Sequence, residues 1–188
     1  MTKSKSLYHL VLAGVLCAIG IIIPMFSPIK IRLDPMSFTL ASHVAVFLAM
    51  FISPAVGVAV SLGTTLGFFL GGFPLPVVLR ALSHIIFAAA GAIYLRKRPE
   101  LVDFHQPVEN RGLKLTVFGC WTSLIHGVCE ALIVIPFYAA TLSGGELIRV
   151  VLLLVCVGSF VHSMIDYAIS LIIWKPLSGT MRKSSVTA

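Results

Sequence analysis

Four side chains that can carry charge or bind a ligand fall inside long apolar stretches of this 188-residue sequence. Arg80 and His84 lie four residues apart in the stretch at 74–95, and His126 and Glu130 lie four residues apart further along the chain. Side chains at this spacing leave the same face of a helix. A charged group in a hydrocarbon core costs several kcal/mol unless it faces protein, water or a ligand. Arg80 is therefore a candidate site residue, with snorkelling to the interface or a purely structural ion pair as the alternatives.

Residue counts give the depth of these side chains, because a helix rises 1.5 Å per residue. Arg80 and Glu130 each fall six residues from the same membrane face, and His84 and His126 ten residues from it. The two pairs are therefore expected at matching depths on antiparallel helices, where they form one cluster.

Three further polar side chains are expected outside this cluster. By the same count, His162 and Asp166 lie fifteen or more residues from that face. We therefore expect them to pair with each other or to connect helices near the opposite face. His43 is expected to be a packing histidine, with a role in the site as the alternative.

The composition indicates the kind of protein that carries these groups. Hydrophobic residues make up 58% of the chain and charged residues 11%, whereas soluble domains carry about 25% charged residues. The length suits about six spans of roughly 20 residues. We predict an all-α integral membrane protein with one domain over 1–188, a short, irregular basic cytoplasmic tail over 176–188 and no cleavable signal.

Prolines, glycines and one long basic loop divide the apolar sequence into candidate spans. These are predicted at residues 6–25, 39–52, 54–72, 74–95, 115–139 and 146–174. The stretch at 39–52 is short for a full crossing and suits a tilted helix that stops part-way. The connection at 27–38 has two prolines and alternating apolar residues, which predict an ordered, extended external loop, and long ordered loops are often lids.

The lysines and arginines predict the orientation. Ten of the fourteen lie in the N-terminus, the loop at 96–114 and the tail, and three lie on the opposite side. Because positive charge collects in the cytoplasm, both termini are predicted to be cytoplasmic and the loop at 27–38 external. The basic residues are sorted by loop and form no single patch, so nucleic acid is not an expected partner.

The motifs expected of an enzyme or an ATPase do not occur. The sequence contains no HExxH, no GxSxG and no GxxxxGK[ST], so we expect neither catalysis nor a nucleotide site in this chain. Histidines and a glutamate can hold a metal, but the permanent cation of Arg80 beside them opposes it, and no metal is expected. The four cysteines lie in apolar runs without a CxxC and are expected to be inert.

The first predicted span carries a stripe of small residues. It contains overlapping pairs at i and i+4, formed by Ala13, Gly14, Cys17 and Ala18. Such pairs let a second helix approach closely in lipid. The spacing alone does not decide between packing inside this chain and docking of a partner.

These features together resemble the substrate-binding S component of an energy-coupling factor (ECF) vitamin transporter. The resemblance covers nearly the whole chain, and its most distinctive stretch is 38–72, FTLASHVAVFLAMFISPAVGVAVSLGTTLGFFLGG, followed by the helix with Arg80 and His84. It implies a protein of the bacterial plasma membrane that holds its ligand near the outer face, between the first loop and helices four to six. It also implies that the small-residue stripe docks on a transmembrane T component, whose two ATPase partners use ATP. No cofactor is then expected in this chain.

The predicted substrate-binding residues follow from the cluster and the external loop. They are Arg80, His84, His126, Glu130, Phe87, Trp121 and Arg32. An arginine among histidines suits an anionic vitamin, and pantothenate is the first choice. Niacin, pyridoxine and hydroxymethylpyrimidine are the alternatives.

Two other classes of function remain open. A stand-alone carrier would use Glu130 or Asp166 as a proton relay, but single-chain carriers usually have two pseudo-symmetric halves, and no internal repeat is evident. A structural membrane subunit would leave Arg80 unexplained.

Overall fold

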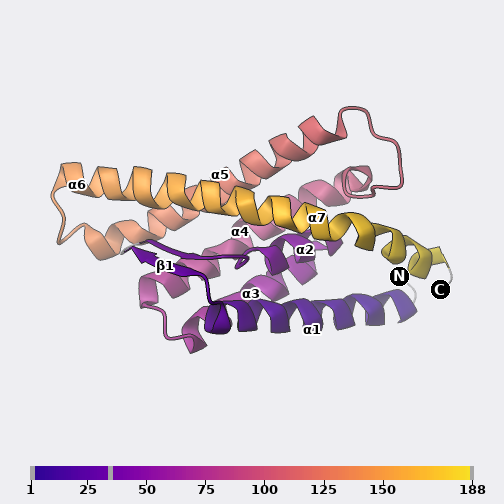
Figure 1. Ribbon diagram of the computed structural model, residues 1–188, viewed down its shortest axis with the longest axis horizontal. Coiled ribbons are helices and arrows are strands. Elements are labelled where there is room, and N and C mark those ends of the chain that lie inside the picture. The colour runs from indigo at the N-terminus through magenta and orange to yellow at the C-terminus, as the bar shows by residue number, and fades with distance from the viewer. Residues whose placement is uncertain (1–2, 34–35, 187–188) are drawn as a thin grey trace.

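The protein is a bundle of helices with one small hairpin (Figure 1), seen in a computed structural model that describes residues 3–33 and 36–186. Its elements follow one another along the chain as α1 (Lys3–Phe26), β1 (Lys30–Leu33), β2 (Met36–Thr39), α2 (Val44–Ile52), α3 (Pro54–Leu70), α4 (Leu75–Lys97), η1 (Pro99–Leu101), α5 (Arg111–Tyr138), α6 (Gly144–Arg149), η2 (Val150–Val157) and α7 (Gly158–Val186).

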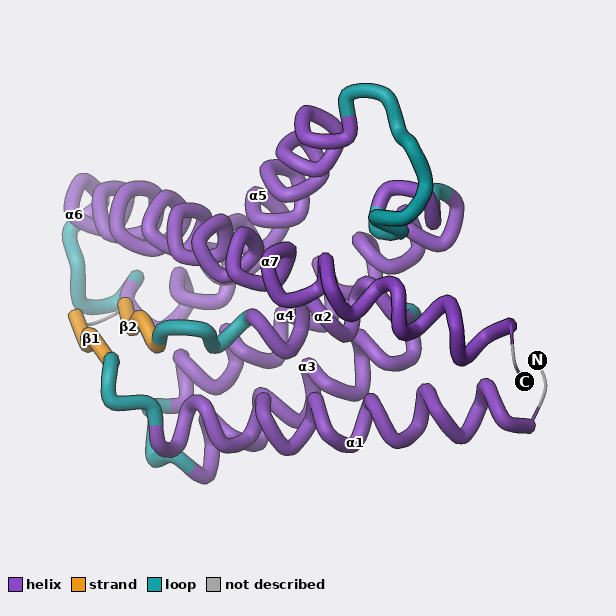
Figure 2. Tube along the Cα trace, turned by 45° about the vertical axis from the view of Figure 1, so that its right-hand side comes forward, coloured by secondary structure: helices purple, strands orange, loops and turns teal. Residues whose placement is uncertain are grey.

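The helices run back and forth between two ends of the molecule. The hairpin and the start of α6 lie at one end, and the two ends of the chain lie at the other (Figures 1 and 2). Within the described part of the chain, four helical segments are long and apolar enough to cross a membrane: α1, α4, α5 and the continuous run from Gly144 to Gly179. These segments confirm the predicted helical membrane protein, while the six crossings and their orientation stay predictions.

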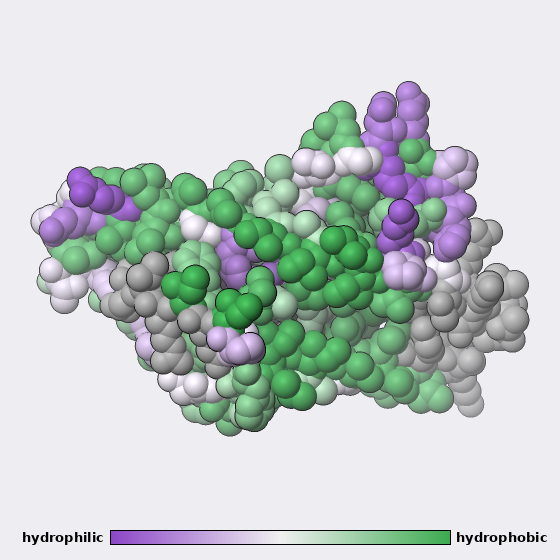
Figure 3. Space-filling view, viewed as in Figure 1, coloured by the Kyte–Doolittle hydropathy of each residue, from purple (hydrophilic) through white to green (hydrophobic). Residues whose placement is uncertain are grey.

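The surface matches a membrane environment. Apolar side chains cover the middle of the face in Figure 3, and hydrophilic ones gather toward its ends. On α1, Leu10 and Ile22 are 69% and 52% exposed. A helix with so much exposed apolar surface is stable only against lipid or a partner.

The short helix α2 ends inside the protein. Its sequence, VAVFLAMFI, is apolar on every side, and eight of its nine residues are buried, as expected of a helix surrounded by protein. Ser53 ends it and begins α3, where the Ser53 hydroxyl accepts a hydrogen bond from the Val56 amide at 3.2 Å and Pro54 takes the first helical position. The partial crossing predicted at 39–52 is thus a buried half-helix.

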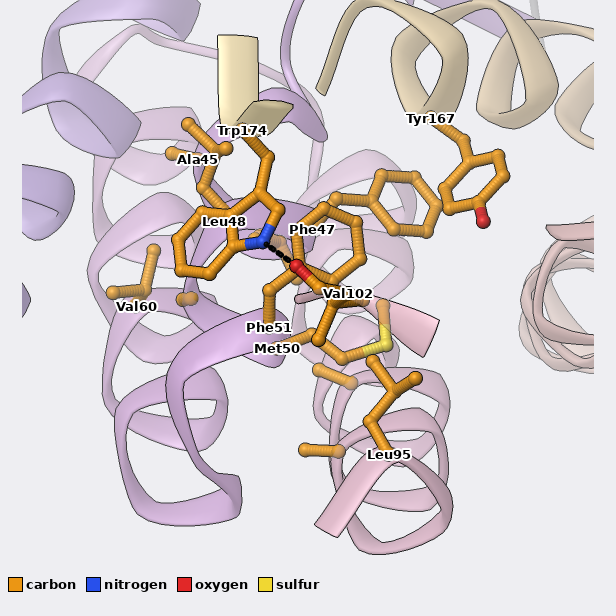
Figure 4. Close-up of a cluster of buried hydrophobic side chains, with 14 of the residues drawn as sticks. Ala45, Phe47, Leu48, Met50, Phe51, Val60, Leu95, Val102, Tyr167 and Trp174 are labelled. Carbon is orange, nitrogen blue, oxygen red and sulfur yellow. Dashed lines mark hydrogen bonds between the residues drawn. The ribbon is translucent and has the colours of Figure 1, made fainter. Parts of the chain in front are cut away.

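The hydrophobic core lies around α2, on the side of the chain ends. Phe47 and Phe51 pack against Tyr167 with ring centroids 5.2 and 6.3 Å away, and Trp174 donates a hydrogen bond to the Val102 carbonyl at 2.9 Å (Figure 4). These aromatic contacts fix α7 against α2. They therefore set the position of every polar group that α7 carries toward α2.

The loop predicted to be extended forms the β1–β2 hairpin. The strands are antiparallel, with Ile31 opposite Phe38 and Arg32 opposite Ser37. The turn at 34–35 lies outside the described residues. An ordered extended segment is confirmed for the part of this loop that the structure describes.

Helix α1 packs on α3 through small residues. A Cβ atom added at Gly67 would lie 2.6 Å from the Ile21 carbonyl oxygen, and one at Gly63 would lie 3.2 Å from the Cys17 sulfur. The glycines therefore let the two backbones approach closely. The predicted stripe on α1 is divided by this contact: Cys17 faces α3 and Ala13 packs on the core, while Gly14 and Ala18 are exposed.

The last helical run is longer than predicted. It begins at a capping box in which Ser143 and Glu146 each bond the other's backbone amide, passes through the π-helical turn η2, and continues through Pro176 to Val186. The irregular tail expected over 176–188 is therefore helical as far as it is described. Proline within a helix removes one hydrogen bond and does not always end the helix.

Candidate functional site

A buried ion pair connects α4 and α5. The Arg80 Nη2 atom donates to the Glu130 Oε2 atom at 2.8 Å, and both side chains are at least 95% buried. Ser159 of α7 donates its hydroxyl proton to the same carboxylate oxygen. Arg80 and Glu130 thus meet as their predicted depths required, and the second carboxylate oxygen faces away from Arg80 toward histidines.

Two of these histidines lie beside Glu130. The His84 and His126 Nε2 atoms are 3.6 and 3.7 Å from Glu130 Oε1, beyond hydrogen-bonding distance. Both rings are 1% exposed. Among the described residues, neither nitrogen of either ring has a hydrogen-bond partner. Because an unsatisfied buried polar group costs about 1–3 kcal/mol, these rings are the first candidates for contact with a ligand.

Asp166 of α7 holds the start of α2. Its Oδ2 atom accepts hydrogen bonds from the His43 amide and from His43 Nδ1, both at 2.9 Å, and its Oδ1 atom accepts from the Ala41 amide at 3.0 Å. Ala41 has a φ of 65°, a conformation that an alanine adopts only when its surroundings enforce it. One carboxylate therefore fixes both the turn before α2 and the orientation of the His43 ring.

His43 lies at the centre of a group of four buried histidines. Its ring centroid is 4.7 Å from that of His84, 4.6 Å from His126 and 4.9 Å from His162. We call these four residues, contributed by the start of α2 and by α4, α5 and α7, the histidine cluster. Ser42 adds a hydroxyl 3.3 Å from His162 Nε2.

The structure corrects the expected positions of His43, His162 and Asp166. We predicted that His162 and Asp166 pair with each other or connect helices near the opposite membrane face. They do face each other, with His162 Nε2 3.6 Å from Asp166 Oδ2, but both lie in the same site as Glu130. The helical run from Gly144 to Gly179 has 36 residues, more than a bilayer requires, so counting from its start placed them too deep. His43 proved to be central because α2 begins inside the protein. The short length predicted for this helix could have indicated that it does so.

The other predicted site residues divide. Phe87 lies in the site, with its ring centroid 5.0 Å from His126 and 5.7 Å from His84. Trp121 instead packs on Tyr94 and Phe118 and does not line the cavity beside the cluster. Arg32 is in β1, and its side chain lies outside the described part of the structure.

A small cavity of about 20 Å³ lies beside the histidine cluster. Its wall consists of Ser37, Ser42, His43, Phe68, Val77, Arg80, Ala81, His84, Glu130, Ser159 and His162. Such a volume holds a water-sized group. Ser37 belongs to β2, and the Phe38 ring lies 5.5 Å from His162, so the hairpin covers the cavity.

One comparison with known proteins found a relative. The chain is 42% identical to the niacin transporter NiaX of Lactococcus lactis subsp. cremoris (strain MG1363) over 174 residues, which are 90% of this chain and 74% of the relative. No family model matches the sequence, and no solved structure matches it.

Proposed function

Because this chain belongs to the same S-component family as the niacin transporter NiaX, we propose that it is the niacin-binding subunit of an ECF-type importer. Within this proposal, the histidine cluster together with Arg80, Glu130 and Phe87 forms the binding site. Niacin replaces pantothenate, our first choice from the sequence, and was among the alternatives. The observation that carries the proposal is the pair of buried rings, His84 and His126, with no hydrogen-bond partner among the described residues.

The chemistry of the site suits a small heteroaromatic acid. Niacin is a single pyridine ring with one carboxylate, so it needs aromatic edges around the ring and one or two polar contacts. The four imidazoles and Phe87 offer both. Pantothenate is a longer, flexible molecule with hydroxyl and amide groups, each of which would need its own partner when buried.

Ligand entry requires the hairpin to move. A cavity of about 20 Å³ is too small for a pyridine ring, and Ser37 and Phe38 of β2 close it on the hairpin side. We therefore assign the β1–β2 hairpin the role of a lid.

Titration calorimetry with the purified chain tests the substrate. Nicotinate is expected to bind and pantothenate is not. His126→Ala should weaken nicotinate binding by about 5- to 150-fold, the equivalent of 1–3 kcal/mol for a lost hydrogen bond to a buried polar ligand. His105→Ala, on an exposed loop, is the matched control and should bind like the unmodified chain. Binding of pantothenate in place of nicotinate would contradict the proposal.

The orientation is tested by labelling single cysteines from outside intact cells. In a chain whose four native cysteines are replaced by alanine, Ile29→Cys near the hairpin should react with an impermeant reagent. Gln106→Cys in the loop after α4 should react only after the cells are opened, because the positive charges place that loop in the cytoplasm. The reverse labelling pattern would place the hairpin on the cytoplasmic side and contradict its role as an external lid.

Docking on the ECF module is proposed to use the exposed part of α1. Ala18 is exposed on that helix, and Ala168 is exposed on α7, so Ala18→Trp and Ala168→Trp are the same change on two faces. Ala18→Trp should abolish co-purification with the T component and the two ATPases, because a large ring prevents close helix approach. Ala168→Trp should have no effect on it.

Both docking variants should bind nicotinate like the unmodified chain, since neither residue lies in the site. Normal co-purification of Ala18→Trp would exclude this face of α1. Accumulation of nicotinate by this chain alone in lipid vesicles would instead favour a stand-alone carrier.

A further inference from the structure

The histidine cluster has the donor set of a transition-metal site. His43, His84, His126 and Glu130 each offer one ligand atom, and these four atoms lie within 4.8 Å of one another. Zinc is commonly bound by three or four nitrogen, oxygen or sulfur atoms at about 2.0–2.3 Å. Imidazole suits zinc and its neighbours in the first transition row. The donors are therefore close enough to be brought together by small side-chain movements.

The contact between His43 and Asp166 has the form that supports a metal ligand. Histidines that bind metals almost always donate their other ring N–H to a carboxylate, a carbonyl or water, which fixes the tautomer and the ring orientation. His43 Nδ1 lies 2.9 Å from Asp166 Oδ2, which leaves Nε2 as the nitrogen for a metal. Asp166, which supports His43, comes from α7. The other three metal donors, His84, His126 and Glu130, come from α4 and α5.

The rings of His84 and His126 also have nitrogens available for the metal ion. His84 and His126 are 1% exposed, and their four ring nitrogens have no hydrogen-bond partner among the described residues. Their Nε2 atoms both face Glu130 Oε1, at 3.6 and 3.7 Å. A cation between these atoms would bind the Nε2 atoms of both rings and the carboxylate oxygen together.

Arg80 does not prevent this arrangement. We expected its charge to repel a metal, but Arg80 is paired with Glu130 Oε2 at 2.8 Å and both are buried. The pair has no net charge, and Glu130 Oε1 remains on the side of the histidines. The same pairing means that Arg80 already has an anionic partner before the carboxylate of a vitamin arrives, and burying a further unpaired charge is costly.

We propose that His43, His84, His126 and Glu130 bind one divalent transition-metal ion of the zinc type, and that this ion contacts the bound vitamin. The first half of the proposal is independent of the substrate. The second half rests on the proposed niacin function, because the pyridine nitrogen and the carboxylate of niacin are both metal ligands. The cavity of about 20 Å³ against His43, His84 and Glu130 has room for a group the size of an ion or a water molecule.

The metal is tested first without the vitamin. The full chain, purified with a histidine-free affinity tag and treated with a chelator, is titrated with Zn²⁺ by calorimetry and with Co²⁺ by visible absorption. One equivalent of each should bind, with the absorption of a tetrahedral Co²⁺ site. His84→Ala and His126→Ala should abolish binding, and His105→Ala should not. Asp166→Asn should lower the metal affinity by about 10- to 100-fold, as loss of a supporting carboxylate does elsewhere.

Nicotinate titration with and without Zn²⁺ then separates the two halves of the proposal. A fall in nicotinate affinity on removal of the metal supports both. If the chelator does not change the nicotinate affinity and the chain takes up no Zn²⁺, the metal site is overturned and the niacin function is kept. Zn²⁺ binding without nicotinate binding keeps the metal site and overturns the niacin function. A Co²⁺ spectrum unchanged in folded His84→Ala overturns the assignment of these ligands.

Discussion

Arg80→Ala is expected to destabilise the protein by about 3–5 kcal/mol, because it leaves the Glu130 carboxylate buried without its cation. The expected size follows from the burial of both partners and from the 2.8 Å contact between Arg80 Nη2 and Glu130 Oε2. Thermal melting in detergent measures the loss. Arg80→Lys should recover part of it, since an ammonium restores the charge but not the planar fork of the guanidinium.

The double variant with Arg80→Ala and Glu130→Gln identifies the cause. Glutamine removes the stranded charge and keeps the shape, so most of the lost stability should return. Ser159 can still donate its hydroxyl proton to the glutamine carbonyl oxygen. A double variant as unstable as Arg80→Ala alone would mean that Arg80 stabilises the fold through other contacts and not through Glu130.

The part of the site on α4 and α5 could be predicted because both are ordinary long helices. Arg80, His84, His126 and Glu130 follow from a spacing of four residues and from residue counts to a common membrane face. Regular helices of ordinary length keep that count accurate, and the structure places the four side chains together.

The rest of the site was not predicted, because α2 and the last helical run depart from regular crossings. Helix α2 has nine residues and begins inside the protein, so His43 is central despite its place near the start of the span predicted at 39–52. The last run has 36 residues and contains a π-helical turn. Depth along it therefore does not follow a simple count, and His162 and Asp166 were misplaced.

For the substrate and the docking stripe, residue type alone did not decide the outcome, because it does not show which partners a side chain has in the fold. Arg80 favoured an anionic vitamin, pantothenate or niacin, when it was counted as a free cation, but its pairing with Glu130 at 2.8 Å removes that argument for both. The small residues of α1 were correctly expected to permit close packing, yet Cys17 uses it within this chain and only Gly14 and Ala18 are exposed for a partner. Spacing identifies a stripe on a helix, whereas the neighbouring helix decides which half of it remains open.

Asp166→Ala is expected to cost about 3 kcal/mol or more, because this carboxylate accepts three hydrogen bonds, from the Ala41 amide, the His43 amide and the His43 ring, and each buried group left unpaired costs about 1–3 kcal/mol. Asp166→Asn keeps one acceptor oxygen and should lose less. Ser170→Ala is the matched control, one turn along the same helix. Its hydroxyl bonds mainly the backbone carbonyl of Asp166, at 2.7 Å, so its removal should cost about 1 kcal/mol or less.

Thermal melting compares the three variants, and protection of the α2 amides from hydrogen exchange locates the change. If Asp166 fixes the start of α2, exchange in Asp166→Ala should rise at residues 41–47 while the α1–α3 contact stays protected. The left-handed turn at Ala41 depends on this support, so its release should also free the His43 ring from the centre of the cluster. A global loss of protection, with no local change at α2, would show that Asp166 contributes to the bundle as a whole and does not position His43.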